Sequence, residues 1–164
     1  MASDIPQSLA DFAGRWKLTR KIIQRSGDVF TFNGEAEFSW RSNVHKEAKG
    51  SVDFEANESA EKSSSNTVLA YIEQGEVIAP TGNVMLAERR YFWLQPQPGV
   101  FEVLFDDSRY FHTFSALHPN AEHLCGEDNY VVRYNFDKWP IWRSTWEVNG
   151  PRKDYIMHSE FTPA

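Results

Sequence analysis

The chain has 164 residues, a net charge of −6 and 15% aromatic side chains. This length fits one domain that needs no cross-links to bury a core, and a single cysteine cannot form an internal disulfide. The acidic balance argues against nucleic-acid binding, and no apolar run reaches the roughly 20 residues that cross a bilayer.

The N-terminal segment, residues 1–12, has no basic stretch followed by an apolar core, so we expect no secretory signal. Within this segment, residues 5–12 are predicted to form one short helical turn, with Ser8 as its N-cap. Because the lone cysteine also calls for no oxidising compartment, we expect a cytoplasmic protein.

From residue 14 onward, alternating apolar and polar side chains predict strands. The clearest alternation covers residues 30–40, where Phe30, Phe32, Phe38 and Trp40 share one face. The full set of predicted strands is 14–22, 30–40, 44–54, 67–73, 76–78, 84–94, 100–105, 109–115, 129–136, 141–148 and 152–161.

Three segments are predicted to lie outside these strands. Residues 55–66 are polar and carry no strand pattern, so we expect a mobile loop there. Gln74 and Gly75 are predicted to form a tight turn, and residues 116–127 a loop.

These elements define the fold class. About ten strands joined by short connections pair antiparallel, because no helix is long enough for a parallel crossover. An open sheet of that size exposes two long edges, and closing it removes them. We therefore predict an all-β chain, residues 1–164, forming a single up-and-down barrel of 8–10 strands. A two-sheet sandwich is the competing arrangement.

Gly14-Arg15-Trp16 follows the predicted helical turn, and this stretch is similar to the Gly-x-Trp that begins the first strand of lipocalins. FAGRW, RRYFW, FDDSRYFH, HLCGEDNY and GPRKDY follow one another along the chain. With these motifs the chain resembles a family of uncharacterised lipocalin-like domains of bacteria and fungi, in the calycin superfamily. The resemblance covers nearly the whole chain and supplies no catalytic residues.

The resemblance implies structural roles for Gly14 and Trp16. Trp16 would plug one end of the barrel, as the lipocalin tryptophan does. A basic residue near the last strand packs over that tryptophan in lipocalins, and Arg152 or Lys153 would do so here by a cation–π contact.

Several predicted inward faces carry a polar side chain among aromatic ones. A buried charge costs several kcal/mol unless it is paired, so such groups either satisfy each other or await a polar ligand. The candidates for ligand binding are Arg20, Arg90, His112, Tyr130, Tyr134 and Lys153.

The arginines have competing interpretations. Arg20 can clamp a ligand carboxylate, or pair with Asp128 or Glu147. Arg90 alternates with Phe92 and Leu94, but it follows Arg89, so one of the two arginines must face solvent.

We predict neither a metal site nor a cofactor. Asp106 and Asp107 fit a hairpin turn, and the pair formed by His123 and Cys125 lacks the further ligands that zinc needs. A nucleophilic Cys125 beside a histidine and a haem held by His112 or His123 are weaker alternatives.

Two functions follow from this sequence. The first is binding of a small amphipathic or aromatic molecule, acidic or carbonyl-bearing, inside the barrel. The alternative is a small cofactor-free isomerase, cyclase or lyase, with His112 as general acid or base and Tyr130 or Tyr134 as donor. The expected partner is therefore a small molecule, with neither nucleic acid nor membrane, and the sequence leaves the oligomeric state open.

Overall fold

The computed structural model describes residues 5–42 and 67–164. The predicted strand 44–54 and polar loop 55–66 lie outside the described residues. The elements in chain order are the 3-10 helix η1 (Leu9–Asp11) and the strands β1 (Gly14–Gln24), β2 (Val29–Ser42), β3 (Thr67–Ile78), β4 (Val84–Gln97), β5 (Val100–Phe105), β6 (Tyr110–Ser115), β7 (Asn120–Cys125), β8 (Asp128–Lys138), β9 (Ile141–Asn149) and β10 (Asp154–Pro163).

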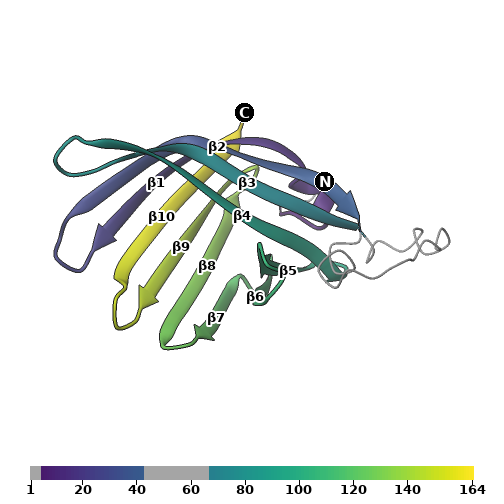
Figure 1. Cartoon of the computed structure of the whole chain (residues 1–164). Coiled ribbons are helices and arrows are strands. Elements are labelled where there is room, and N and C mark those ends of the chain that lie inside the picture. Colours follow the sequence, from purple (N-terminus) through teal and green to yellow (C-terminus); the bar gives the residue numbers. More distant parts are fainter. Residues whose placement is uncertain (1–4, 43–66) are drawn as a thin grey trace.

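The ten strands form one antiparallel sheet in the order β6-β5-β4-β3-β2-β1-β10-β9-β8-β7 (Figure 1). Its two ends, β6 and β7, come together through aromatic side chains, with the Phe111 and His123 ring centroids 5.7 Å apart. The sheet is therefore a nearly closed barrel, as predicted from the alternation and the short connections, and not a two-sheet sandwich.

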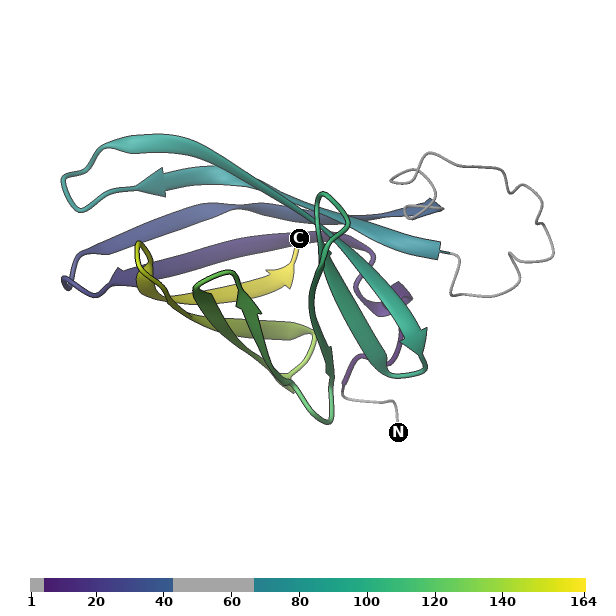
Figure 2. The ribbon, with the colours of Figure 1, turned by 60° about the horizontal axis from the view of Figure 1, so that its bottom comes forward.

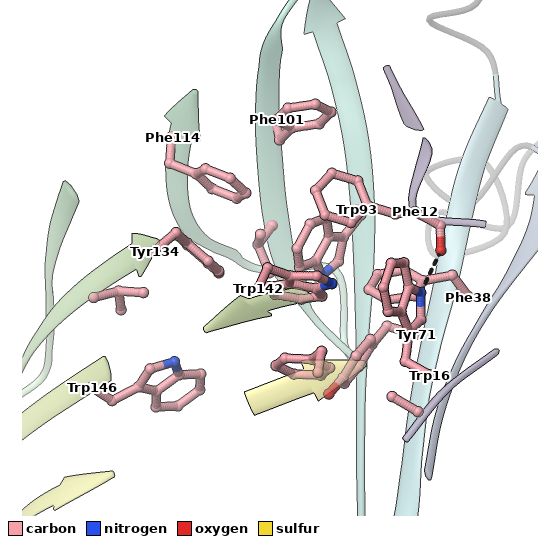
Figure 3. Packing of buried hydrophobic residues seen from close by; sticks show 14 of the residues in the cluster. Phe12, Trp16, Phe38, Tyr71, Trp93, Phe101, Phe114, Tyr134, Trp142 and Trp146 are labelled. Atoms are coloured by element: carbon pink, nitrogen blue, oxygen red, sulfur yellow. Dashed lines mark hydrogen bonds between the residues drawn. The ribbon is translucent and has the colours of Figure 1, made fainter. Parts of the chain in front are cut away.

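The two ends of the barrel differ. The turns of the β1–β2, β3–β4 and β9–β10 hairpins lie at one end, which we call the hairpin end, and η1 lies at the other (Figure 2). At this second, plugged end the Phe12 ring packs against the rings of Trp93, Phe101 and Trp142 (Figure 3). The helical turn predicted for residues 5–12 is present as η1, whose N-cap is Ser8.

Gln74 and Gly75 do not form a turn; β3 continues through them. Gly75 lies directly opposite Gly34 on β2, and a Cβ atom at Gly34 would come within 2.1 Å of the Gln74 carbonyl oxygen. At Gly75, a Cβ atom would lie 2.7 Å from the Phe32 ring. The two glycines therefore mark a close approach of two strands, which a sequence pattern does not distinguish from a turn.

The loop predicted for residues 116–127 is also wrong, because it contains β7. The pattern of β7 is weak: Leu124, its one large aliphatic residue, points outward and is exposed, whereas Ala121, His123 and Cys125 are half-buried. Such a strand lacks the apolar alternation on which the prediction depends.

The glycine pair leads to a stability prediction. Gly34→Ala should lower the free energy of unfolding by about 1–3 kcal/mol or more, because the new methyl group overlaps the facing backbone. Asn33→Ala, at the exposed neighbouring position, is the control and should change it by less than about 0.5 kcal/mol. Urea unfolding followed by circular dichroism measures both, and equal stabilities of the two variants would contradict the close approach.

Candidate ligand-binding site

Within the described residues, a cavity lies inside the barrel between its plugged end and its hairpin end. We call it the interior cavity, and it is lined by Arg20, Tyr71, Glu73, Arg89, Tyr91, Trp93, Val103, Phe111, His112, Tyr134, Trp142, Ser144, Trp146 and Phe161. Its volume is about 30 Å³, which is room for one or two water molecules. The aromatic rings therefore fill most of the barrel. Of the lining residues, only Arg89 and Tyr91 are not buried.

A buried ion pair crosses one side of this cavity. The Arg20 guanidinium donates to both carboxylate oxygens of Glu73, at 2.5 and 2.9 Å, and its Nε donates to Ser159 Oγ at 2.7 Å. The Tyr71 hydroxyl also donates to Glu73. These contacts tie together β1, β3 and β10. The acid that pairs with Arg20 is thus Glu73, and not Asp128 or Glu147, which contact Lys153 and Arg133.

The pair keeps both groups charged. Burial alone would raise the pKa of Glu73, but the guanidinium of Arg20, with that of Arg89 nearby, lowers it below its usual value. Burial alone would lower the pKa of Arg20, but the neighbouring Glu73 carboxylate raises it above its usual value. Burial and the neighbouring Glu73 charge raise the pKa of Tyr71 well above its usual value, so this phenol stays neutral.

Arg89, and not Arg90, belongs to the cavity. Arg89 Nε lies 3.9 Å from a Glu73 oxygen, and its guanidinium lies over the Trp146 ring at 5.6 Å. Arg90 points outward, with 55% of its side chain exposed, and pairs with Glu88. The expected inward placement of Arg90 is therefore wrong. β4 is apolar on both faces around Phe92 and Trp93, so alternation alone could not decide which arginine points inward.

A bulge in β6 aims His112 into the barrel. His112 pairs with Val103 and Tyr110 with Leu104, so Phe111 has no opposite residue on β5. Phe111 and His112 are consequently both buried. Tyr110, which the alternation predicts on the same inward face as His112, is exposed instead.

His112 contacts Tyr134 across the gap between β6 and β8. Its Nε2 lies 2.9 Å from the Tyr134 hydroxyl. Among the described buried side chains, two nitrogens have no hydrogen-bond partner: His112 Nδ1 and Trp142 Nε1. Both residues line the interior cavity. Because buried polar groups are nearly always paired, these two nitrogens mark a place where a partner can bind.

Burial disfavours the charged imidazole. Desolvation, with a smaller contribution from His123, lowers the pKa of His112 to about 3. Burial also raises the pKa of Tyr134, so both members of the pair are neutral at physiological pH.

Tyr130 and Lys153 lie outside the cavity lining. Lys153 Nζ donates to the Tyr130 hydroxyl at 3.1 Å and lies 3.4 Å from Asp128 Oδ2. Tyr130 is buried and packs against Phe111, whereas 45% of the Lys153 side chain is exposed. The predicted inward placement of Lys153 is therefore wrong. The structure brings together Arg20, His112 and Tyr134 around one cavity and leaves Tyr130 and Lys153 as a separate pair.

Trp16 is buried at the plugged end, where its Nε1 donates to the Phe12 carbonyl oxygen at 2.8 Å (Figure 3). Gly14 begins β1 with a φ of +118°, which side chains rarely adopt, so glycine is needed there. Neither Arg152 nor Lys153 packs over Trp16. Because β10 runs antiparallel to β1, Trp16 pairs with Pro163, and the start of β10 lies at the opposite end.

Among the residues of the cavity that sequence reasoning did not name as candidates are Glu73 and Trp142. A signal existed for Glu73, since it alternates with Leu69 and Tyr71 and so shares their inward face. The predicted turn at Gln74 and Gly75 placed Glu73 at the end of its strand, so this inward position was not recognised. Within the described residues, no three histidine, cysteine, aspartate or glutamate side chains gather closely enough to hold a metal ion.

Taken together, the fold and the cavity define an antiparallel barrel with an aromatic interior and an internal ion pair. The chain belongs to DUF6314, a family of unknown function, which matches residues 12–163. None of the curated proteins matches it. Within its described part, the chain has no helix with the length and hydrophobicity that crossing a membrane requires.

Among solved structures, the chain is similar to the S-type phycobiliprotein lyase CPES from Guillardia theta. The TM-score is 0.51 and the identity 6%, and the match covers 93% of this chain and 86% of that one. A likeness at this identity shows a common fold and does not transfer an activity.

The buried ion pair leads to a second stability prediction. Glu73→Gln should lower the free energy of unfolding by about 3–5 kcal/mol, because it leaves the Arg20 charge buried without its carboxylate. Glu147→Gln, which breaks the exposed pair with Arg133, is the control and should cost less than about 1 kcal/mol. Both values come from denaturant unfolding at pH 7, and a Glu73 variant as stable as the control would refute this account.

His112 leads to a pH prediction. Its pKa falls from 6.5 to about 3 on folding, so the unfolded state binds the proton more readily. The stability due to neutral His112 is complete above pH 6.5 and is lost as the pH falls toward 3. Between pH 7 and pH 5 this loss amounts to about 2 kcal/mol.

His112→Gln should remove this part of the pH dependence, whereas His118→Gln, at an exposed position, should retain it. Urea unfolding at pH 7 and pH 5 measures the difference for each protein. The same slope in the His112 variant as in the native chain would show that His112 is not the group responsible.

Proposed function

We propose that the chain binds a small amphipathic or aromatic molecule, acidic or carbonyl-bearing, inside the barrel. The observation that carries this proposal is the pair of unpartnered nitrogens, His112 Nδ1 and Trp142 Nε1, on two residues that line one cavity. Each buried polar group without a partner costs about 1–3 kcal/mol. A ligand that supplies the missing partners recovers that free energy.

The chemistry of the ligand follows from the direction of the His112–Tyr134 hydrogen bond. A phenol is a strong donor and an imidazole nitrogen a strong acceptor, so we assign the proton between them to the Tyr134 hydroxyl. His112 then carries its own hydrogen on Nδ1. Both unpartnered nitrogens are donors, and carbonyl or carboxylate oxygens satisfy them.

The size of the cavity sets the route of entry. A volume of about 30 Å³ does not admit an aromatic molecule without movement of side chains. The lining residues of the plugged end are buried in close ring contacts, whereas Arg89 and Tyr91 are half-exposed. The ligand therefore enters from the hairpin end and displaces these two side chains.

The alternative, a cofactor-free enzyme, requires two titratable groups within hydrogen-bonding distance beside one cavity. His112 and Tyr134 meet this condition. A general base, however, works best with a pKa near the operating pH, and His112 has a pKa of about 3. The pair is thus better suited to hold a ligand than to move its proton, and for this reason we favour binding.

The fold also supports a ligand in the interior, because the mouths of β-barrels are frequent ligand sites. We assign the whole chain, residues 1–164, to one lipocalin-like barrel domain and place it in the cytoplasm, where the free thiol of Cys125 stays reduced.

The proposal predicts a role for Trp142 in binding. Benzamide and the larger cinnamamide, two aromatic amides with a carbonyl acceptor, should bind the native chain in isothermal titration calorimetry. Trp142→Phe removes the N–H donor and should weaken binding about tenfold, the value of one hydrogen bond. Trp40→Phe is the matched control, because Trp40 is exposed and does not line the cavity.

Near-UV circular dichroism establishes that both variants keep the native packing. Binding that is equal in the two variants would place the amides elsewhere on the protein. If the native chain binds neither these amides nor the corresponding acids, benzoate and cinnamate, the proposed function fails.

A further inference from the structure

We propose that the interior cavity selects an anionic ligand, of the monocarboxylate class, and that Arg89 is the residue that recognises its charge. This inference rests on the proposed function and names the chemical class of its ligand. The sequence names Arg90 and does not decide which of Arg89 and Arg90 points inward, whereas the structure places Arg89 at the cavity.

The first argument is the charge of the cavity lining. It contains two permanent cations, Arg20 and Arg89, and one carboxylate, Glu73. The tyrosines and His112 add no charge, since burial raises the pKa of Tyr71, Tyr91 and Tyr134 and lowers that of His112. The lining thus carries one positive charge in excess, and a ligand with one negative charge neutralises it.

The second argument is the geometry of the arginines. Arg20 takes up both oxygens of Glu73 in a two-pronged contact. Arg89 Nε lies 3.9 Å from the nearer oxygen, which is beyond hydrogen-bonding distance. Arg89 therefore feels the Glu73 charge without occupying its oxygens. A guanidinium has five N–H donors in a planar fork, which matches a carboxylate in two parallel hydrogen bonds.

The third argument is the position of Arg89. Its side chain is 35% exposed, and it lines the cavity. The Trp146 ring lies beneath its guanidinium, and Phe111 and Tyr91 also line the cavity. An aromatic carboxylate can place its ring against these side chains, with one carboxylate oxygen at Arg89 and the other accepting from an unpartnered donor of the lining. The apolar walls and the single excess charge favour a planar monoanion over a doubly charged phosphate.

Arg90 provides an internal control. It has the same chemistry one residue along β4, but it points outward and pairs with Glu88 at 2.5 Å. A general attraction of the protein for anions would depend equally on both arginines. A site inside the barrel depends on Arg89 alone.

The test compares matched probes on matched variants. Benzoate and cinnamate are titrated calorimetrically against benzamide and cinnamamide, into the native chain, Arg89→Gln and Arg90→Gln. We expect each acid to bind the native chain about ten- to a hundredfold more tightly than its amide. Arg89→Gln should abolish this preference, and Arg90→Gln should retain it. Arg89→Lys, which keeps the charge, should restore part of it if the Gln variant packs poorly.

The outcomes separate this inference from the proposed function. If acids and amides bind the native chain equally, or if Arg90→Gln weakens the preference as much as Arg89→Gln does, the inference is overturned and binding inside the barrel stands. If neither acids nor amides bind the native chain, both proposals fail.

Discussion

The ion pair between Arg20 and Glu73 determines what the interior of this barrel can do. Burying two charges costs several kcal/mol each, and the cost is offset only when the geometry satisfies both groups. Here Ser159 and Tyr71 complete the hydrogen bonds that the pair leaves open. A barrel filled with rings alone would be a closed core. The satisfied pair keeps a polar region in the interior and places Arg89 next to a carboxylate that is already occupied.

The incomplete closure of the sheet has a related consequence. β6 and β7 are the ends of the sheet, and side chains join them where other neighbours are joined by backbone hydrogen bonds. Phe114 stacks on Tyr134 with centroids 3.9 Å apart, and His112 bonds to the same tyrosine. The contact between β6 and β8 thus depends on ring stacking and on the hydrogen bond between His112 and Tyr134. His112 therefore both joins β6 to β8 and carries an unpartnered nitrogen.

Much of the fold could be predicted from the sequence, because alternation over long strands such as β2 reports which residues are buried. The prediction failed where that alternation carries no information. On β4 both faces are apolar, so alternation does not decide whether Arg89 or Arg90 points inward, and the structure places Arg89 at the cavity. At Gly75 the absence of a side chain reflects the facing strand, and a single sequence does not show which strand faces which. The same limit hid the partner of Arg20, because β2 lies between β1 and β3 and the contact depends on the register of both pairings.

The distribution of packing and charge is compatible with the proposed binding in a barrel that is almost full. At the plugged end, Phe12 contacts several rings and the Trp142 ring stacks on Phe161 at 3.8 Å, so movement there would break many contacts at once. Toward the hairpin end, the cavity is bounded by half-exposed side chains whose polar groups can exchange a neighbour for water or a ligand. The rigid end fixes the position of the Trp142 donor, and the looser end would admit the proposed ligand. A site with this division can be preorganised for its polar contacts and still adjust in volume.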